Sequence, residues 1–379
     1  MRVFHLVPNL NYGGLQEVVR GLALSQSHSG HAVTIGCWTN TGNHAEAERD
    51  LERAGVRIVY LRRDADGGMS FGRISLFSKL RQYLGPRNAD ILHVHNPFDY
   101  YLYGVIAARV AGGTAIVHTL HATVMFDWAV RKAAGARWLK GERTKVQFWI
   151  AAMLTDRLVS VCSESEEILR GMFFLPGKKL CVVENGINLT PFAGIPARNP
   201  RDEIVFGAVG RMSFEKNHRG LIEAFALAHR NHGNIRLRLL GSGHLESTLR
   251  QLVHDHGLAD VVEFCGFSHD VAGFLGTLDV FVLPSISEAL PLSLLEAIAS
   301  GLPVVATAVG GVPGVVQRTD SGWVCAPQNS DALLAAMETA IAFQDRRERG
   351  ERARHLVAEY YSAERMARDY ELIYRELLH

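Results

Sequence analysis

Short runs of apolar residues alternate with stretches of helical periodicity along most of the chain. The first runs are RVFHLVP, AVTIGCW, RIVYL, ILHVH and AIVHTLH, and helix-like stretches separate several of them. Runs without polar alternation predict strands of a parallel sheet that helices cover on both faces. The first half of the sequence therefore predicts an open α/β domain, with its functional groups beyond the carboxyl ends of the strands.

The same pattern starts again after an irregular segment. The stretch ENGINLTPFAGIPARNPRDE contains three prolines and two glycines and has little periodicity, as is typical of a linker. The strand-like runs IVFGAVG, IRLRLLG, VVEFCG, VFVLPS and PVVATA follow, again with helices between them. We predict two α/β domains at 1–190 and 204–358, a linker at 191–203 and a C-terminal helix at 359–379.

The bulk composition is that of a globular protein. The chain has 379 residues, which is too long for one ordinary core, and its net charge of +1 gives no general attraction to nucleic acid. Residues 1–195 carry a net charge of +6 and residues 196–379 carry −5, which indicates domains with different partners. Five scattered cysteines without metal-ligand spacing favour a reduced, cytoplasmic protein.

Two carboxylates bracket a largely apolar segment, EALPLSLLEAIASGLP. Pro291 fits the start of a helix and Gly301 its C-terminal end. The N-terminus of such a helix favours an anion such as phosphate, and Glu288 and Glu296 flank that position. Two acceptors beside a phosphate site suit a nucleotide sugar, which has hydroxyls on both sides of its diphosphate. The alternative is that both are solvated acids without a role in binding.

Three further loops follow predicted strands and offer groups that suit an anion. Arg211 and Lys216 are the only cations of GRMSFEKN, and paired cations can neutralise a diphosphate leaving group without a metal. A solvated turn is the alternative interpretation of this loop. Gly13 and Gly14 of NYGGLQEVV and Gly241 of LLGSGHLE allow backbone N–H groups to approach an anion. Tight strand-to-helix turns require the same residues.

Four histidines fall at the ends of two neighbouring predicted strands: His93, His95, His118 and His121. This grouping predicts a polar pocket, and His121 is the residue that we expect in the site. Metal binding is the rival interpretation. No carboxylate or cysteine accompanies the histidines in a ligand pattern, so we expect no metal and no other cofactor.

The segment 128–149 combines cations with aromatic residues. RKAAGARWLKGERTK holds six cations and one acid, and Trp128, Trp138, Phe148 and Trp149 lie in or near it. Cations interleaved with aromatics suit an anionic membrane surface, which favours peripheral membrane attachment and a lipid-linked acceptor. A solvated, partly packed helical hairpin is the alternative.

These motifs together resemble the retaining glycosyltransferases of the GT-B fold, in particular glycosyltransferase family 4 (glycosyl transferases group 1). SEALPLSLLEAIASGLPVVATAVGGVPGVV resembles the family's Glu-x7-Glu signature, and GRMSFEKN resembles its Gly-Arg-x-x-x-Glu-Lys-Asn loop. LLGSGHLESTL, VEFCGF and LDVFVLPS match the intervening blocks in order, and DILHVHNP, HTLHA and VENGIN match the first half more loosely. The resemblance implies an α/β protein with two Rossmann-like, doubly wound domains facing each other across a cleft. It also implies a last helix that crosses back to the N-terminal domain.

The resemblance implies a role for four charged residues of the second half. Arg211 and Lys216 would hold the donor diphosphate. Glu288 would contact the hydroxyls of the transferred sugar, and Glu296 those of the ribose. These four residues would carry the donor site.

Further residues would complete the site by the same resemblance. Gly14, next to Gly13, would approach the donor phosphate, and His121 would lie against the transferred sugar near the reacting carbon. Backbone groups of Ala289 and Leu290 would contact the phosphate or sugar, and Phe267 would lie by the base. The family often has glycine where this chain has Ala289, and the added methyl group would reshape the loop at the donor.

The implied activity is that of a retaining, metal-independent hexosyltransferase. It would move a hexose from a nucleotide-diphosphate sugar, with a UDP-sugar favoured and GDP-mannose next, to a glycan or lipid-linked acceptor. Surface polysaccharide or glycolipid assembly at the inner face of the cell membrane is the expected setting, with no nucleic acid as a partner. The alternatives are a non-hydrolysing sugar-nucleotide epimerase and a non-catalytic sugar-binding or scaffolding homologue.

Overall fold

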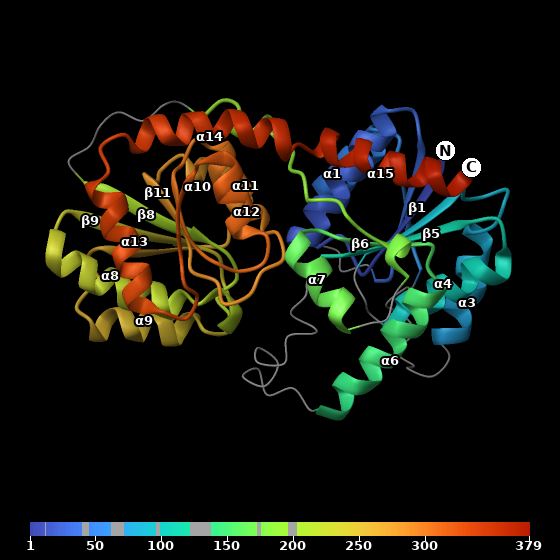
Figure 1. Ribbon diagram of the computed structural model, residues 1–379, viewed down its shortest axis with the longest axis horizontal. Helices are drawn as coiled ribbons and strands as arrows, with labels where there is room; N and C mark the ends of the chain where they lie inside the picture. Colours follow the sequence, from blue (N-terminus) through green and yellow to red (C-terminus); the bar gives the residue numbers. More distant parts are fainter. Residues whose placement is uncertain are drawn as a thin grey trace. The chain divides into compact units, whose positions relative to one another are not determined.

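The computed structural model shows a chain divided into two compact units, each built on one parallel sheet (Figure 1). The structure describes residues 1–11, 13–39, 45–61, 72–95, 99–121, 138–172, 176–195 and 203–379. Within these residues, unit 1 holds the chain up to Ile187 together with Ala363–His379, and unit 2 holds Asn188–Ser362. The division at Ile187 lies just before the linker predicted at 191–203, part of which is outside the described residues.

The sheet of unit 1 has seven strands in the order β3-β2-β1-β4-β5-β6-β7, and neighbouring strands pair in parallel. Their bounds are β1 Arg2–Val7, β2 Ala32–Cys37, β3 Arg57–Tyr60, β4 Ile91–His95, β5 Ala115–Leu120, β6 Arg157–Ser160 and β7 Leu180–Val182. The chain winds outward from β1 to β3 and then restarts at β4 on the other side of β1. This reversal creates a topological switch point, where open α/β sheets bind ligands.

Helices cover both faces of this sheet. Their bounds are α1 Gly14–His28, α2 Ala45–Arg53, α3 Gly72–Tyr83, α4 Asp99–Ala111, α6 Trp138–Leu154, α7 Ser163–Met172 and α15 Ala363–Leu378, with a 3-10 turn η1 at Gly177–Lys179. Helices α4 and α6 lie on one face, where Tyr101 and Phe148 pack on the ring of His118. Helices α1 and α15 lie on the other face, where Gln26 and Tyr374 hydrogen-bond to each other.

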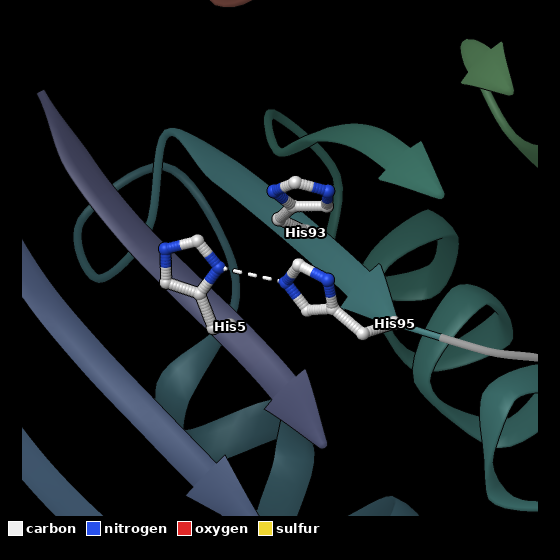
Figure 2. Close-up of side chains that lie close together, drawn as sticks. All are labelled: His5, His93 and His95. Carbon is white, nitrogen blue, oxygen red and sulfur yellow. Dashed lines mark hydrogen bonds between the residues drawn. The ribbon is translucent and has the colours of Figure 1, made fainter. Parts of the chain in front are cut away.

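The interior of unit 1 beneath α1 and α15 is polar. The side chains of His5, His93 and His95 share one face of the sheet, because His5 pairs with His93 and His95 follows two residues later (Figure 2). All three rings are fully buried. Buried polar groups are tolerated where each has a hydrogen-bond partner, so this part of the core depends on directional contacts.

The sheet of unit 2 has six parallel strands in the order β10-β9-β8-β11-β12-β13. The strands are β8 Ile204–Val209, β9 Ile235–Leu240, β10 Val262–Gly266, β11 Val280–Leu283, β12 Val304–Thr307 and β13 Gly322–Cys325. The helices are α8 His218–His232, α9 Glu246–Asp255, α10 Val271–Leu275, α11 Leu292–Ala299, α12 Val312–Thr319, α13 Ser330–Ala342 and α14 Arg346–Tyr360, with 3-10 turns η2 Thr190–Phe192 and η3 Phe214–Lys216. The chain again reverses beside its first strand, between β8 and β11, which makes a second switch point.

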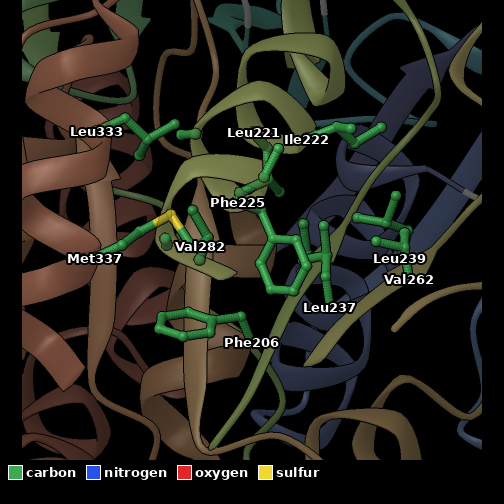
Figure 3. Close-up of a cluster of buried hydrophobic side chains, with 14 of the residues drawn as sticks. Phe206, Leu221, Ile222, Phe225, Leu237, Leu239, Val262, Val282, Leu333 and Met337 are labelled. Atoms are coloured by element: carbon green, nitrogen blue, oxygen red, sulfur yellow. The ribbon is translucent and has the colours of Figure 1, made fainter. Parts of the chain in front are cut away.

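The core of unit 2 is apolar, in contrast to the polar interior of unit 1. Phe206 of β8, Phe225 of α8, Leu237 of β9 and Met337 of α13 are fully buried in one cluster between the sheet and its helices (Figure 3). Each such side chain contributes about 1.5–3 kcal/mol through its removal from water. The continuous apolar strands that predicted this domain therefore supply its stability.

The C-terminal region forms two helices. Helix α14 ends at Tyr360 in unit 2, and α15 begins at Ala363 in unit 1, where the Ala363 N–H donates to the carbonyl of Ile187 at 2.9 Å. The helix predicted at 359–379 thus starts later in the structure, because Tyr361 has left the helical conformation. Among the described residues, no helix is long and apolar enough to cross a membrane.

Candidate functional site

The two charged motifs of unit 2 meet at the carboxyl ends of β8 and β11. Nζ of Lys216 lies 2.5 Å from Oε1 of Glu288, and the Ser285 hydroxyl donates to the same oxygen at 2.7 Å. The two charged side chains are 23% and 11% exposed, so they are partly withdrawn from solvent. The structure therefore brings one predicted cation and one predicted carboxylate into a single polar cluster.

Asn217 joins the loop after β8 to the loop after β11. Its backbone is left-handed, with φ at 50°, a conformation that asparagine tolerates. Its amide oxygen accepts from the Gly220 N–H at 3.3 Å and caps α8, while its amide nitrogen donates to the Pro284 carbonyl at 3.1 Å. The Ile286 N–H also donates to the Glu215 carbonyl at 2.8 Å. These bonds set the position of Lys216 against Glu288.

A second carboxylate supports the loop after β8. The Ser213 hydroxyl donates to Oε1 of Glu215 at 2.6 Å. Burial raises the pKa of Glu215, but the bonds from Ser213 and a backbone N–H and the charges of Lys216 and Arg211 hold it below its ordinary value. Glu215 therefore stays ionised at neutral pH. Arg211 is exposed in this loop, where its guanidinium can reach a ligand.

Gly241 lies where the loops after β8, β9 and β10 come together. Its φ is +139°, and a Cβ atom there would collide with the carbonyl oxygen of Gly210. Its N–H donates to the carbonyl of Gly266 at 2.7 Å. The contacts seen at Gly241 are those of a tight turn, and its part in substrate binding stays a prediction.

Ala289 and Leu290 are buried immediately before α11. The Gly311 N–H donates to the Ala289 carbonyl at 2.7 Å, so the loop after β12 supports this segment. Pro291 is the N-cap of α11 and the helix begins at Leu292, one residue later than predicted, because Pro291 has an extended ψ of 127°. The backbone groups of Ala289 and Leu290 therefore lie just before the first turn of α11.

Two predicted binding residues, Glu296 and Phe267, lie on other elements than Lys216 and Glu288. Glu296 is half-buried on α11, beyond the first turn of the helix. Phe267 follows β10 and is 58% exposed, with its ring edge-to-face on His269 at 4.8 Å. Strands β8 and β9 separate β10 from β11 in the sheet. The exposed ring of Phe267 offers an apolar face at one side of the strand-end surface.

In unit 1, the Gly-Gly turn connects β1 to α1. Gly13 is the N-cap of α1 in an extended conformation and Gly14 is the first helical residue. The side-chain oxygen of Asn9 accepts from the Asn11 N–H at 3.0 Å and from the Gln16 amide at 3.1 Å, which holds the turn in place. Gly14 is exposed, so an approaching ligand can reach this helix start.

His121 follows β5 and belongs to the polar interior of unit 1. Its Nε2 lies 3.0 Å from Nδ1 of His95. Burial lowers the pKa of His121 to about 3, although a hydrogen bond with Asn185 acts in the opposite direction. The imidazole is therefore neutral at physiological pH. His118 lies on the other face of the sheet against Tyr101, so the prediction of one pocket for all four histidines is wrong for this residue.

Several residues of these sites were not singled out from the sequence. Ser285 and Asn217 position Lys216 and Glu288, and Asn217 directly before a helix was a recognisable N-cap signal. In unit 1, His5 and Gln26 bind to each other at 2.7 Å. The single histidine of the first strand gave little signal until its register against β4 was known.

One group of histidines in unit 1 has ring nitrogens close enough together to bind a metal ion. One ring nitrogen from each of His5, His93 and His95 lies within 4.8 Å of the others. All six ring nitrogens of these residues already have a hydrogen-bond partner within the protein. A metal ion would have to displace several of these bonds.

Each unit is a doubly wound parallel sheet with a switch point beside its first strand, which defines a protein with two Rossmann-like domains. Solved structures share this architecture over the whole chain. HepE of Anabaena in complex with UDP and glucose is 18% identical, with a TM-score of 0.79 and coverage of 100% of both chains. Sucrose-phosphate synthase from Thermosynechococcus elongatus is 22% identical, with a TM-score of 0.76 and coverage of 99% and 98%. The predicted GT-B fold is confirmed.

The sequence matches two glycosyltransferase families, one in each half of the chain. Residues 12–190 match "Glycosyltransferase Family 4", and residues 195–356 match "Glycosyl transferases group 1". The chain therefore belongs to glycosyltransferase family 4 and is a glycosyltransferase. The family membership expected from the Glu-x7-Glu and Gly-Arg motifs is confirmed.

Curated relatives match different shares of the chain. A UDP-Gal:alpha-D-GlcNAc-diphosphoundecaprenol alpha-1,3-galactosyltransferase from Escherichia coli is 30% identical over 280 residues, 70% of this chain and 68% of that protein. An N-acetyl-alpha-D-glucosaminyl L-malate synthase from Bacillus anthracis is 29% identical over 318 residues, 80% and 79% of the two chains. The putative colanic acid glycosyltransferase WcaL of Escherichia coli K12 is 35% identical over 178 residues, which span 44% of that relative.

Proposed function

We propose that the protein is a retaining hexosyltransferase that uses a nucleotide-diphosphate sugar, with a UDP-sugar first and GDP-mannose second. The observation that carries this proposal is the pair of Lys216 and Glu288, joined by Ser285 at the strand ends of unit 2. Support for UDP comes from the galactosyltransferase relative, whose name includes UDP-Gal, and from HepE, which was solved with UDP and glucose.

The acceptor that we propose is a glycan or a lipid-linked glycan, in polysaccharide or glycolipid assembly. The galactosyltransferase relative is named for an acceptor on diphosphoundecaprenol, and WcaL is named for colanic acid biosynthesis. The cytoplasmic side of the membrane is the setting that such a lipid-linked acceptor favours.

Lys216 has the donors to serve both a carboxylate and a phosphate. Its ammonium carries three N–H groups, and only one contact, to Glu288, is needed to hold it in the free protein. The other N–H groups can bind the β-phosphate, with Arg211 of the same loop as the second cation. Glu288 retains a second oxygen for the hydroxyls of the sugar. These two cations supply the charge stabilisation that a metal ion gives in other transferases.

The proposed reaction is a front-face substitution. The bond between the anomeric carbon and the diphosphate oxygen breaks, and the acceptor oxygen bonds to the carbon from the same side. The acceptor proton passes to the departing phosphate oxygen, so no separate base is required. Double displacement needs a carboxylate that can attack the anomeric carbon, whereas Glu288 is held by Lys216 and Ser285.

A thermal-shift panel tests the donor site. We expect UDP to raise the melting temperature more than GDP or ADP, equally with Mg²⁺ and with EDTA, because ligand binding stabilises the folded state. Arg211→Ala and Lys216→Ala remove this shift. Arg219→Ala is the control, since Arg219 is exposed on α8 and pairs with Glu223. A shift that requires Mg²⁺ contradicts the metal-free site, and no shift with any nucleotide contradicts the proposal.

Turnover with a nucleotide sugar tests the chemistry. Loss of one charged group that stabilises the leaving diphosphate lowers kcat by about 100- to 1,000-fold. We therefore expect this loss in Lys216→Ala, and an α-linked product from an α-linked donor when the anomeric configuration is followed by NMR. Near wild-type turnover in Lys216→Ala or an inverted product rules out the mechanism. Conversion of the donor without any acceptor favours the epimerase, and binding without turnover favours the scaffold.

An exposed apolar stripe on α6 supports peripheral attachment to a membrane. Val146, Trp149, Ile150 and Met153 are 57%, 46%, 39% and 40% exposed. Their spacing places them on one face of the helix, and Phe148 on the opposite face is buried against the sheet. An anionic lipid surface suits this stripe, because the chain on its N-terminal side is rich in Lys and Arg. Part of the predicted segment 128–149, up to residue 137, lies outside the described residues.

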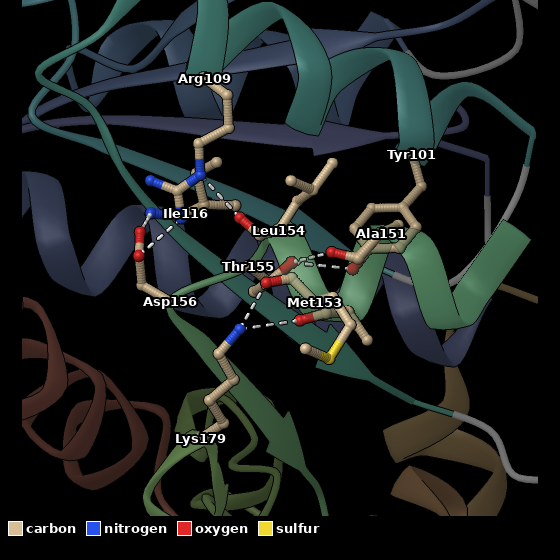
Figure 4. A network of polar contacts seen from close by, with 10 residues as sticks. Tyr101, Arg109, Ile116, Ala151, Met153, Leu154, Thr155, Asp156 and Lys179 are labelled. Atoms are coloured by element: carbon tan, nitrogen blue, oxygen red, sulfur yellow. Dashed lines mark hydrogen bonds and ion pairs between the residues drawn. The ribbon is translucent and has the colours of Figure 1, made fainter. Parts of the chain in front are cut away.

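The C-terminal end of α6 is firmly held by cations (Figure 4). Nζ of Lys179 donates to the Met153 carbonyl at 2.5 Å, and Nε of Arg109 donates to the Leu154 carbonyl at 2.7 Å. Arg109 also pairs with Asp156 at 2.6 Å. These contacts satisfy carbonyls that a helix end leaves without partners and fix the direction in which the stripe faces.

Vesicle sedimentation tests the membrane proposal. We expect the protein to bind vesicles that contain anionic lipid better than neutral vesicles. The double variant Trp149→Ser/Ile150→Ser weakens this binding by about tenfold or more, because it removes apolar side chains that would leave water. Leu372→Ser is the control, since Leu372 is 66% exposed, more than either of these residues, but lies on α15. Equal losses in both variants, or no binding by the wild type, contradict the proposal.

A further inference from the structure

The two loops that meet at the strand ends of unit 2 contain as many carboxylates as cations. The loop 210–217 holds Arg211, Glu215 and Lys216, and the loop 284–291 holds Glu288. Their two positive and two negative side chains give a net charge of zero before any ligand binds. Positive charge attracts a diphosphate, so each carboxylate of the cluster reduces that attraction.

The two carboxylates have different partners. Oε1 of Glu288 accepts from the ammonium group of Lys216 at 2.5 Å and from the Ser285 hydroxyl at 2.7 Å, so its charge is matched by a cation in direct contact. Oε1 of Glu215 accepts from the Ser213 hydroxyl at 2.6 Å. A neutral hydroxyl orients a carboxylate and leaves its negative charge in place.

Glu215 is held in position beside the two cations. Ser213 is 5% exposed, so water competes little with its hydroxyl for the carboxylate. The Ile286 N–H donates to the Glu215 carbonyl at 2.8 Å, and the Lys216 N–H donates to the Ser213 carbonyl at 3.2 Å. These bonds fix the backbone that carries the carboxylate. Glu215 is therefore a permanent part of the surroundings of Lys216.

The carboxylate of Glu215 is ionised at neutral pH. Burial raises the pKa of Glu215, but the bonds from Ser213 and a backbone N–H and the charges of Lys216 and Arg211 hold it below its ordinary value. The same charges act in both directions, because a carboxylate that is stabilised by two cations also weakens the field that those cations present to a ligand.

The substrate and the product of the proposed reaction differ in charge. A nucleotide sugar carries about two negative charges, one on each phosphate, because the sugar blocks the last oxygen. Loss of the sugar frees a terminal phosphate whose second pKa is about 6, so the nucleoside diphosphate gains about one more negative charge at neutral pH. A fixed carboxylate near the phosphates therefore repels the product more strongly than the donor.

We propose that Glu215 is a specificity-determining residue that disfavours the nucleoside diphosphate product relative to the nucleotide-sugar donor, and so limits inhibition by the product. This inference rests on the proposed function, in which Arg211 and Lys216 hold the diphosphate. Ser213 keeps the carboxylate in place when the anion arrives. Weaker retention of the product favours turnover, because product release limits kcat in many enzymes.

Three substitutions separate the charge of Glu215 from its position. Glu215→Gln removes the charge and keeps an amide oxygen that can accept from the Ser213 hydroxyl. Ser213→Ala removes this hydrogen bond and keeps the charge. Glu223→Gln is the control, since it changes the net charge of the protein equally but lies on α8, where Glu223 pairs with Arg219 at 2.9 Å.

Calorimetric titration with UDP, UDP-glucose and uridine tests the charge effect. We expect Glu215→Gln to bind UDP about tenfold and UDP-glucose about threefold more tightly, with uridine unchanged, because the gain follows the charge of the ligand. The gain for UDP decreases at high salt, which screens the carboxylate. Ser213→Ala and Glu223→Gln retain the wild-type ratio of the two affinities. An unchanged ratio in Glu215→Gln, or an equal change of the ratio in either of the other variants, overturns the proposal.

Inorganic pyrophosphate separates this inference from the proposed function. It carries the charge of a diphosphate without a base or a sugar, and we expect Glu215→Gln to bind it about tenfold more tightly than the wild type does. If this gain is observed but no nucleotide sugar is turned over, the proposed function fails while the charge effect of Glu215 stands. Equal affinity of the two proteins for pyrophosphate, or no binding by either, overturns the inference.

Discussion

The backbone around Glu288 depends on a single glycine in the next loop. Gly310 has φ at +48°, and a Cβ atom there would collide with the carbonyl oxygens of Glu288 and Ala289. We expect Gly310→Ala to displace this loop, lower the UDP-induced thermal shift and reduce stability by about 1–3 kcal/mol, since a left-handed conformation and a close contact are both involved. Thermal melts with and without UDP measure both effects.

Gly314 is the matched control for this substitution. It lies four residues later within α12, and a Cβ atom there would meet no atom within 4 Å. Alanine is favoured over glycine inside a helix by about 1 kcal/mol, so Gly314→Ala leaves the UDP response unchanged and does not lower stability. Similar behaviour of the two variants would mean that Gly310 has no special role at the loop.

The charged residues of the proposed donor site could be singled out individually from the sequence, but their contacts could not. Arg211, Lys216 and Glu288 lie in loops that follow strands, and Glu296 lies on the next helix, so this local pattern is visible in the sequence. The bond between Lys216 and Glu288 joins residues 72 positions apart, and it depends on the order of the strands. Asn217 also has to adopt a left-handed backbone before the two loops can meet.

At the level of elements, the end of α6 depends on a lysine from a later turn. Lys179, at the end of η1, donates to the Met153 and Ala152 carbonyls, and burial lowers its pKa. We expect Lys179→Met to lower the free energy of unfolding by about 1 kcal/mol and to weaken vesicle binding, because α6 would fray at the end that carries the stripe. Urea unfolding and vesicle sedimentation measure the two effects.

The neighbouring residue provides the comparison. Lys178 is exposed in the same turn, so Lys178→Met removes the same charge without the contacts to α6. If both substitutions weaken vesicle binding equally, net charge rather than the held end of α6 governs attachment.

Element boundaries were less predictable than element types. The sequence indicated one helix at 359–379, whereas the structure ends α14 at Tyr360 and begins α15 at Ala363. The position of the break is set by tertiary contacts, because the Ala363 N–H donates to the carbonyl of Ile187. The start of α11 was correct to within one residue, because a proline restricts its own φ and blocks a helical hydrogen bond.

At the scale of the whole molecule, buried neutral histidines predict instability in mild acid. His5 and His218 have pKa values of about 4, lowered from 6.5 mainly by burial. Below pH 6.5 the unfolded chain binds protons that the folded protein does not take up until about pH 4, so stability present above pH 6.5 is lost as the pH falls. Each such histidine contributes a loss of about 1.4 kcal/mol per pH unit in this window.

Urea unfolding at pH 7, 6 and 5 measures this dependence. His218→Gln removes one buried histidine from unit 2. We expect it to reduce the slope of the free energy of unfolding against pH by the contribution of that histidine. His254→Gln is the control, since the side chain of His254 is 80% exposed. An unchanged slope in His218→Gln would contradict the assignment of acid lability to buried imidazoles.

The two-domain α/β architecture was largely predictable, whereas the polar interior of unit 1 was not. Continuous apolar strands such as VFVLPS specify a parallel sheet irrespective of which strand lies beside them. The hydrogen bonds of the buried histidines depend on the register of β1 against β4. They also depend on Tyr374 of α15, which lies 348 positions from Gln26. Contacts of that range follow from the finished fold and leave no local periodicity in the sequence.

The contrast between the two interiors has a consequence for how the chain tolerates change. In unit 2 the core around Phe225 is specified by volume, so one aliphatic residue can replace another of similar size at modest cost. In unit 1 the hydrogen bonds that link Gln26, His5, His95 and His121 are directional. Replacement of one of these residues reverses or interrupts the bonds between the others. Libraries that repack the first domain must therefore change these positions as a correlated set, whereas the second domain can be varied one site at a time.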